Sequence, residues 1–277
     1  MTPREALLQC GAGEAASIAW AAVAGRLDER TRERCRQAAP NLNSLHTAVF
    51  PYYTPPQAGG NLSLYARGED YHRVLARRLG QAAHELEGAF PGYSFLPFAD
   101  ASPFPERMAA SLCGLGVLGQ NGLLITPRWG SYVFIGLLAS DLPWEGQGMD
   151  PGRCLRCMAC IRACPGGALG EGGFAPERCL SHITQLRGER TAQQDELVRR
   201  HPLLWGCDVC QAVCPMNRGT EETALPEFRE ELLHRLQPED CALSDRQFRR
   251  KYQARAFCWR GVAPLRRNAD LQREGER

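Results

Sequence analysis

The sequence predicts an α+β protein with a mixed N-terminal domain, a cysteine-rich domain and a short basic helical tail. Helix-like and strand-like segments mix in the first half of the chain without a regular βαβ repeat. Eight of the thirteen cysteines lie between residues 154 and 214, and charged residues dominate the C-terminal part of the chain. We therefore expect domains over residues 1–148, 149–220 and 221–277.

The N-terminal domain begins with a segment that predicts helix, since residues 1 to about 40 are rich in Ala and Arg. The stretch PNLNSLHTAVFPYYTPPQAGG then predicts a short apolar strand that runs into a Pro/Gly loop. A helix is expected behind Asp70 as its N-cap, because apolar residues recur at helical spacing at Tyr71, Leu75, Leu79, Ala82 and Leu86.

The rest of this domain predicts one more helix and two strands. PERMAASLCGLG indicates a helix that ends at Gly114 and Gly116, and LLIT and SYVFIGLLA indicate strands joined by a turn through Pro127 and Gly130. Gly114, Gly116 and Gly119 also spell GxGxxG. Because this run follows a helix and precedes a strand, it favours a tight turn over a dinucleotide site.

Composition narrows the function classes. The net charge of +2 excludes a general polyanion binder, and Lys251 is the only lysine. We see no secretory signal and no apolar run long enough to cross a bilayer, so we expect a cytoplasmic protein without a membrane partner. Disulfides are disfavoured in the cytoplasm, and thirteen cysteines there indicate metal.

The stretch CLRCMACIRACP spaces four cysteines as CxxCxxCxxxCP, the run that bacterial ferredoxins use for [4Fe–4S] clusters. Zinc is the alternative, but overlapping CxxC units suit a tetrahedral zinc site poorly. A second run, LWGCDVCQAVCP, lacks one ligand because Leu204 stands at its position, and Cys179 is assigned there by elimination. We therefore predict one cluster on Cys154, Cys157, Cys160 and Cys214, and a second on Cys164, Cys179, Cys207 and Cys210.

Five cysteines remain, and we expect them to be small buried residues without a role: Cys10, Cys35, Cys113, Cys241 and Cys258. Two clusters form a short electron path, so a reaction site is expected in the N-terminal domain. Asp100 follows an apolar pair there, which would raise its carboxyl pKa toward a proton-donor role. The residues alone favour an Asx turn or N-cap for Asp100, a helix-start salt bridge for Glu106 with Arg107, and no metal role for His72 and His182.

Taken together, several stretches resemble the epoxyqueuosine reductase family. They run in the family's order from about Phe50 to Asn217, as FPYYTP, LYARGEDYH, DASPFPER, GLGVLGQNGLLITPRWGSYVFIG, the two cysteine runs, RCLSHIT and GCDVCQAVCPMN. The resemblance implies a reductase that converts epoxyqueuosine in tRNA to queuosine with cobalamin and two [4Fe–4S] clusters. The N-terminal domain would hold the cobalamin, and residues 149–220 would form a ferredoxin-like domain.

The resemblance also assigns residues. Asp100 matches the family's proton donor in DxxPxxER, and Tyr65, Asn121, Ser181 and Asp208 lie in motifs that imply cobalamin contacts. No DxHxxG motif is present, so the resemblance implies cobalamin bound without a protein ligand to cobalt. The implied partners are a tRNA anticodon stem-loop and an electron donor such as a flavodoxin or ferredoxin.

The chain departs from the family in two places. Gln120 stands where the family pattern has lysine, and AFCWRGVAPLRRNAD resembles only the beginning of C-terminal helical repeats that help to hold tRNA. We therefore expect a short member that lacks most of these repeats. The tail offers eight cations for phosphate contacts, although such a face is as often simply solvated: Arg246, Arg249, Arg250, Lys251, Arg255, Arg260, Arg266 and Arg267.

Two other functions stay open from the sequence. The chain could be a cobalamin-dependent reductase of a small molecule, similar to reductive dehalogenases, or a non-catalytic iron–sulfur electron-transfer protein. An electron carrier alone would not need an N-terminal domain that bears these motifs.

Overall fold

The computed structural model describes residues 1–150, 152–170 and 173–275, which form two compact units. Unit 1 consists of Met1–Pro51, Tyr71–Gly119 and Leu123–Arg156, and unit 2 of Tyr52–Asp70, Gln120–Gly122 and Cys157–Arg277. The fold class is α+β, as the sequence predicts. The finer division at residues 148 and 220 stays a prediction.

Unit 1 is built on a four-stranded antiparallel sheet with the strand order β1-β2-β6-β3, and a small hairpin, β4-β5, stands apart from it. Its elements are α1 (Pro3–Gln9), β1 (Glu14–Ala19), α2 (Trp20–Ala24), α3 (Glu29–Ala38), β2 (Ser44–Pro51), α4 (Tyr71–Ala89), β3 (Phe95–Ala99), α5 (Glu106–Leu112), β4 (Val117–Leu118), β5 (Leu124–Ile125) and β6 (Val133–Ser140).

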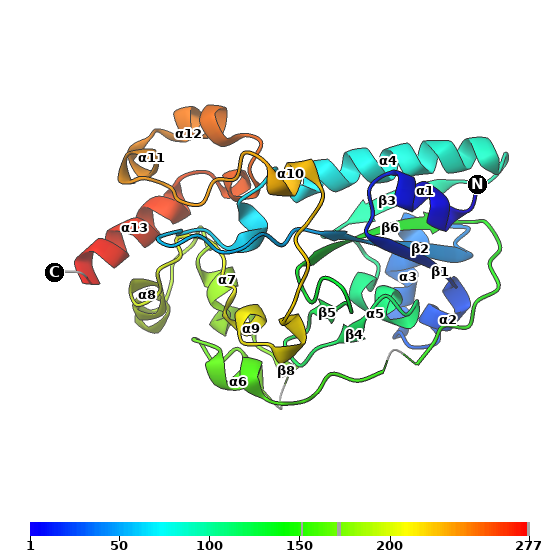
Figure 1. The fold of residues 1–277 in the computed structure, drawn as a ribbon, viewed down its shortest axis with the longest axis horizontal. Helices are drawn as coiled ribbons and strands as arrows, with labels where there is room; N and C mark the ends of the chain where they lie inside the picture. The colour runs from blue at the N-terminus through cyan, green and yellow to red at the C-terminus, as the bar shows by residue number, and fades with distance from the viewer. Residues whose placement is uncertain (151, 171–172, 276–277) are drawn as a thin grey trace. The chain divides into compact units, whose positions relative to one another are not determined.

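Helices cover both faces of this sheet, so all eight residues of β2 are buried. Helices α1 and α4 lie on one face, and α2, α3 and α5 lie on the other (Figure 1). Helix α4 begins directly after Asp70 and buries Leu75, Leu79 and Leu86, as its spacing predicts. It approaches β6 at Gly136, where an added Cβ would lie 3.0 Å from the Leu79 methyl groups.

Several sequence predictions for this unit are wrong in detail. The expected helical lead-in is interrupted by β1, and β3 was not predicted at all. The Ala-rich segment EAASIA favours helix by propensity, but six backbone pairings with β2 make it an edge strand. The two predicted strands LLIT and SYVFIGLLA are present as β5 and β6. They belong to different sheets, because β5 pairs with β4 and β6 enters the main sheet between β2 and β3.

The glycines of GxGxxG form a turn, as predicted. Gly114 has a left-handed φ of 80°, and an added Cβ at Gly116 would lie 2.5 Å from the carbonyl oxygen of Ile125. These glycines therefore let the end of α5 turn into the β4-β5 hairpin.

Unit 2 consists mainly of short helices. Its elements are η1 (Leu64–Ala66), α6 (Ala159–Ala163), β7 (Leu169–Gly170), β8 (Gly173–Phe174), η2 (Pro176–Arg178), α7 (Leu180–Ile183), α8 (Ala192–Arg199), α9 (Val209–Ala212), η3 (Pro215–Asn217), α10 (Pro226–Arg229), α11 (Pro238–Ala242), α12 (Asp245–Tyr252), η4 (Ala256–Arg260) and α13 (Ala263–Gly275). An aromatic core of Trp205, Phe248, Tyr252 and Phe257 holds its C-terminal part together, and the tail is helical as expected. In the part of the chain that the structure describes, no helix combines the length and the apolar character that a membrane crossing requires.

Candidate functional site

Asp100 follows β3 in a turn and has a backbone conformation that is rare for residues other than glycine. Its φ is +58°, in the left-handed region that only a few non-glycine residues occupy. One carboxylate oxygen, Oδ2, accepts a hydrogen bond from the Tyr71 hydroxyl at 2.5 Å and meets His72 Nε2 at 3.0 Å. Two side chains from the start of α4 therefore meet one carboxylate oxygen at the end of β3.

The aromatic rings hold this arrangement in place. The Tyr71 ring stacks on Phe134 of β6 with centroids 4.3 Å apart and planes within 6°, and it also stacks on His72 at 4.0 Å. Because Phe134 belongs to the central part of the sheet, the hydroxyl that faces Asp100 is fixed by the sheet itself.

The expectation of a raised pKa for Asp100 is wrong. The hydrogen bond from His72 lowers the pKa of the Asp100 carboxyl most, the bond from Tyr71 lowers it further, and partial burial opposes both. The apolar pair ahead of Asp100 suggested desolvation, but two polar partners from a helix 28 and 29 positions earlier outweigh it. Asp100 is therefore ionised in this structure and must take up a proton before it can donate one.

Glu106 is the carboxyl with the raised pKa in this turn. Burial raises its pKa to about 7, and the charge of Asp100 adds to this effect, while hydrogen bonds from the Ser102 hydroxyl at 2.7 Å and the Asp100 backbone amide lower it. Glu106 thus ties the Asp100 turn to the first turn of α5.

The cysteine runs form irregular loops around short helices. Arg156 and Met158 alternate with the first three cysteines, and both have left-handed φ values of 50° and 62°. Non-glycine residues in this conformation persist where their surroundings impose it, which is common at binding sites. Helix α6 carries Cys160, helix α9 carries Cys210, and the two helices pack against each other.

The predicted second set of thiols lies together in unit 2. The pKa of Cys207 is raised to about 11 and that of Cys210 to about 12, mainly by burial, and the charges of Cys164 and Cys179 raise both further. Charges act in this way over short distances, so Cys164 and Cys179 lie in the neighbourhood of Cys207 and Cys210. In addition, the Ala168 backbone amide donates to Cys164 Sγ at 3.2 Å, as amides do toward cluster-bound sulfur.

Three cysteines of the predicted first set belong to unit 2: Cys157, Cys160 and Cys214. Cys154 belongs to unit 1, which ends at Arg156. Cys160 also raises the pKa of Cys210, so the two sets meet at α6 and α9. Within residues 1–150, 152–170 and 173–275, no three His, Cys, Asp or Glu side chains stand as close as a single metal ion would need. A four-iron cube binds each thiolate through a different iron atom, whereas a zinc ion binds all its ligands directly.

Two predicted cobalamin contacts have protein partners. The Asp208 carboxylate accepts the Ser63 hydroxyl and, at 2.9 Å, the Leu64 amide, and burial raises its pKa. The Tyr65 hydroxyl accepts from Trp205 Nε1 at 2.8 Å. Both side chains thereby join segment 61–66 to segment 204–208, and their cofactor roles stay predictions.

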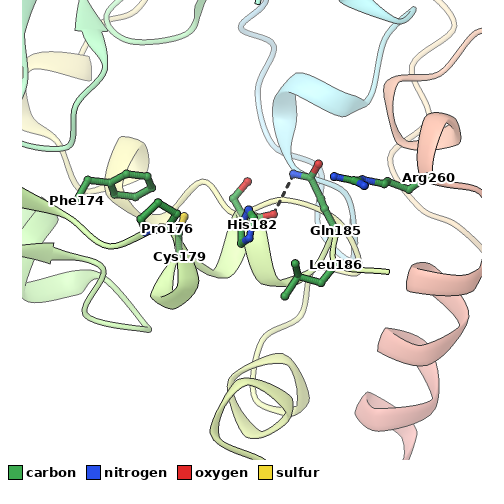
Figure 2. Close-up of a pocket in the computed structure, with 8 residues that line it drawn as sticks. Phe174, Pro176, Cys179, His182, Gln185, Leu186 and Arg260 are labelled. Carbon is green, nitrogen blue, oxygen red and sulfur yellow. Dashed lines mark hydrogen bonds between the residues drawn. The ribbon is translucent and has the colours of Figure 1, made fainter. Parts of the chain in front are cut away.

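Ser181 lines a cavity of about 300 Å³ beside Cys179, together with His182, Gln185 and Arg260 (Figure 2). Gln185 Nε2 donates to the Ser181 carbonyl at 2.9 Å. Hydroxyl, amide and guanidinium groups next to a predicted cluster ligand suit a polar part of cobalamin, whereas the whole molecule needs more room than this cavity offers. The placement of the corrin over residues 1–148 stays a prediction.

Gln120 and Asn121, which the family resemblance singles out, also lie in unit 2. Asn121 is buried, and Gln120 Nε2 lies 3.3 Å from Met158 Sδ, inside the first cysteine run. The amide at position 120 therefore reaches the cluster loop without bringing the charge that lysine would bring.

Four of the remaining five cysteines are buried, as expected. Cys10, Cys35, Cys241 and Cys258 are buried, and Cys113 is partly buried against Thr47. Burial raises the pKa of Cys113 and of Cys241 to about 11, so both are neutral thiols at physiological pH.

Sequence reasoning missed Tyr71 and His72 as site residues. The signal was present in LYARGEDYH, where both residues stand in a stretch that carries the family resemblance. Their side chains meet Asp100 only because β3 returns antiparallel to β6 beside the start of α4.

Comparison with known proteins identifies the family. Residues 32–101 match the family model "Epoxyqueuosine reductase QueG, DUF1730", and residues 153–217 match "4Fe-4S double cluster binding domain". The epoxyqueuosine reductase of Lactococcus garvieae is 36% identical over 218 residues, which are 76% of this chain and 60% of that protein. The chain thus spans about 60% of the length of this relative.

Solved structures agree with this. A crystal structure of epoxyqueuosine reductase with an epoxyqueuosine-modified tRNA-Tyr stem loop superposes with a TM-score of 0.84 at 25% identity, covering 98% of this chain and 79% of that one. The Bacillus subtilis enzyme, described with its catalytic aspartate loop swung out of the active site, superposes with a TM-score of 0.83 at 25% identity, covering 98% and 79%. This chain belongs to the epoxyqueuosine reductase family.

Proposed function

We propose that this protein reduces epoxyqueuosine in tRNA to queuosine, using cobalamin and two [4Fe–4S] clusters. The observation that carries the proposal is the gathering of Cys164, Cys179, Cys207 and Cys210 within the region that matches a double-cluster domain. The names of the relatives supply the substrate, and the tRNA stem loop bound to one of them supplies the partner.

The residues present suit the cofactors of this family. Cys154, Cys157, Cys160 and Cys214 would hold one cluster, and Cys164, Cys179, Cys207 and Cys210 the other. Ser181 and its neighbours would receive a polar part of cobalamin. When bound, these groups would supply single electrons for the reduction.

The reaction takes up two electrons and two protons, forms a C=C bond and releases the epoxide oxygen as water. The protein supplies protons to that oxygen. We assign this step to Asp100, whose Oδ2 faces the Tyr71 hydroxyl and His72 Nε2. Because the Asp100 pKa is low here, we assign the reprotonation of Asp100 Oδ2 to a protonated His72, whose Nε2 lies 3.0 Å from it.

The proposal is tested with anaerobically reconstituted protein and an anticodon stem-loop that contains epoxyqueuosine. We expect conversion to queuosine, and we expect Asp100→Asn to keep its iron and cobalamin while losing at least about 10²-fold in turnover. Asp150→Asn is the control, because this exposed carboxylate accepts the Gly152 amide and has no assigned role in the reaction, so turnover should be unchanged.

The outcomes separate the alternatives. Cobalamin binding without conversion of the stem-loop would indicate a reductase of another substrate, and clusters without cobalamin binding would indicate an electron-transfer protein. An active Asp100→Asn variant would overturn the proton-donor assignment alone.

A further inference from the structure

A second cavity in unit 2, of about 530 Å³, has a basic lining that the proposed chemistry does not use. Four arginines line it, and the lining contains no acidic residue: Arg199, Arg200, Arg235 and Arg273. Three carboxylates outside the lining pair with these arginines: Glu196 with Arg199 and Arg200, Asp270 with Arg273, and Glu274 with Arg199 at 3.9 Å. Four guanidinium groups against three carboxylates leave the rim with a net positive charge.

The guanidinium groups are accessible to a partner. The side chains of Arg200 and Arg273 are 79% and 62% exposed. Arg235 is exposed as well and donates to a backbone carbonyl, that of Gly59, at 2.7 Å, so this bond does not neutralise its charge.

The floor of this cavity reaches a predicted cluster ligand. His201 lines the cavity, and its Nε2 lies 4.0 Å from Cys207 Sγ. The His201 backbone is held in place by Gln272 of α13, whose side-chain amide donates to the carbonyls of His201 and, at 3.2 Å, Leu203. The His201 side chain therefore connects the basic rim to Cys207, a predicted ligand of the second cluster.

We propose that this Arg-lined rim docks an acidic one-electron carrier protein and that electrons enter the second cluster beside His201. The inference rests on the proposed function, because it takes Cys207 as a cluster ligand. Charge complementarity selects the partner, since a net positive rim around a redox entry point attracts negatively charged donors and speeds their encounter. The transfer is one electron at a time, from the reduced carrier to the oxidised cluster, with no bond formed.

The test is the rate at which the clusters are reduced, followed by their visible absorbance under anaerobic stopped flow. The probe is a reduced flavodoxin of strongly negative net charge, and photoreduced deazariboflavin serves as a small uncharged reductant. We expect Arg200→Glu/Arg273→Glu to slow reduction by flavodoxin about tenfold or more at low ionic strength, and the difference to vanish at high salt. Reduction by deazariboflavin should be unchanged.

The matched control is Arg30→Glu/Arg34→Glu, which reverses two exposed arginines of α3 that do not line the cavity. Equal slowing by this control, or full-speed reduction of Arg200→Glu/Arg273→Glu by flavodoxin, would overturn the docking site. If Arg200→Glu/Arg273→Glu loses its clusters, Glu196→Gln provides the test instead. Removing this carboxylate should increase the rate at which flavodoxin reduces the clusters, and an unchanged rate contradicts the proposal. A protein that neither reductant bleaches would instead contradict the proposed function.

Discussion

Asp100 and Glu106 lie in one turn, yet their surroundings move their pKa values in opposite directions. Two polar partners on α4 lower the pKa of Asp100, and burial raises that of Glu106 to about 7. The spacing of the cysteines was readable from the sequence because their chemistry is local. The charge state of Asp100 was not, because Tyr71 and His72 reach it through tertiary structure.

The Asp100 turn should loosen as the pH rises through neutrality. The Glu106 carboxyl binds its proton more tightly when the turn is folded than when the carboxyl is exposed to water. Protonation of Glu106 therefore stabilises the folded turn. This stabilisation is complete below the ordinary pKa of 4.5 and is lost as the pH rises through about 7. The charged neighbours are Asp100, which raises this pKa, and Arg107, which lowers it, with His72 acting through Asp100.

Hydrogen exchange of residues 99–106, corrected for the intrinsic pH effect, measures this loosening. We expect faster exchange at pH 8 than at pH 6 in the natural protein. Glu106→Gln, a neutral mimic that still accepts a hydrogen bond, should abolish the difference. Glu87→Gln on the exposed side of α4 is the control and should retain the difference. Equal exchange rates at pH 6 and pH 8 in this control or in the natural protein would show that Glu106 does not titrate as described.

At the scale of elements, long periodic segments were predictable and edge strands were not. Helix α4 follows its apolar spacing, whereas β1 is Ala-rich and β3 contains Pro97, so neither carries a strand pattern of its own. Both become strands because β2 and β6 offer them backbone partners. Pairing partners lie far apart in the sequence, and no local pattern encodes them.

The packing of α4 on the sheet should depend on the absence of a side chain at Gly136. Its added Cβ would lie 2.9 Å from the Phe50 ring and 3.0 Å from Leu79, so Gly136→Ala should destabilise the protein by about 1–3 kcal/mol in urea unfolding. Gly80→Ala in α4 is the matched control. An added Cβ meets nothing within 4 Å there, and alanine should stabilise the helix by about 0.5–1 kcal/mol.

A Leu79→Ala background tests the cause. Removing the Leu79 methyl groups makes room for the new Cβ, so the cost of Gly136→Ala should shrink in the double variant. An unchanged cost would show that contact with the Phe50 ring, and not contact with Leu79, destabilises Gly136→Ala.

At the scale of the whole molecule, most of the basic tail serves the fold. Lys251 pairs with Asp240, and Arg249 pairs with Asp245. Arg255, Arg266 and Arg267 donate to backbone carbonyls of unit 2. The sequence offers eight cations as candidate phosphate contacts, but it cannot distinguish a charge that binds a partner from one that holds a loop against a helix.

Arg246 and Arg250 are the cations of α12 best placed for RNA. They are exposed, lie four residues apart on one helix face, and form no ion pair in the part of the chain that the structure describes. If the chain binds a tRNA anticodon stem-loop as proposed, Arg246→Ala/Arg250→Ala should weaken binding and reduce the slope of log Kd against log salt by about 1.5–2. Arg30→Ala/Arg34→Ala, with the same spacing on the exposed face of α3, is the matched control and should leave the slope unchanged. A slope that changes equally in both variants would mean that RNA responds to total charge. A slope that changes in neither would mean that the basic tail, like its five structural cations, is committed to the fold of unit 2.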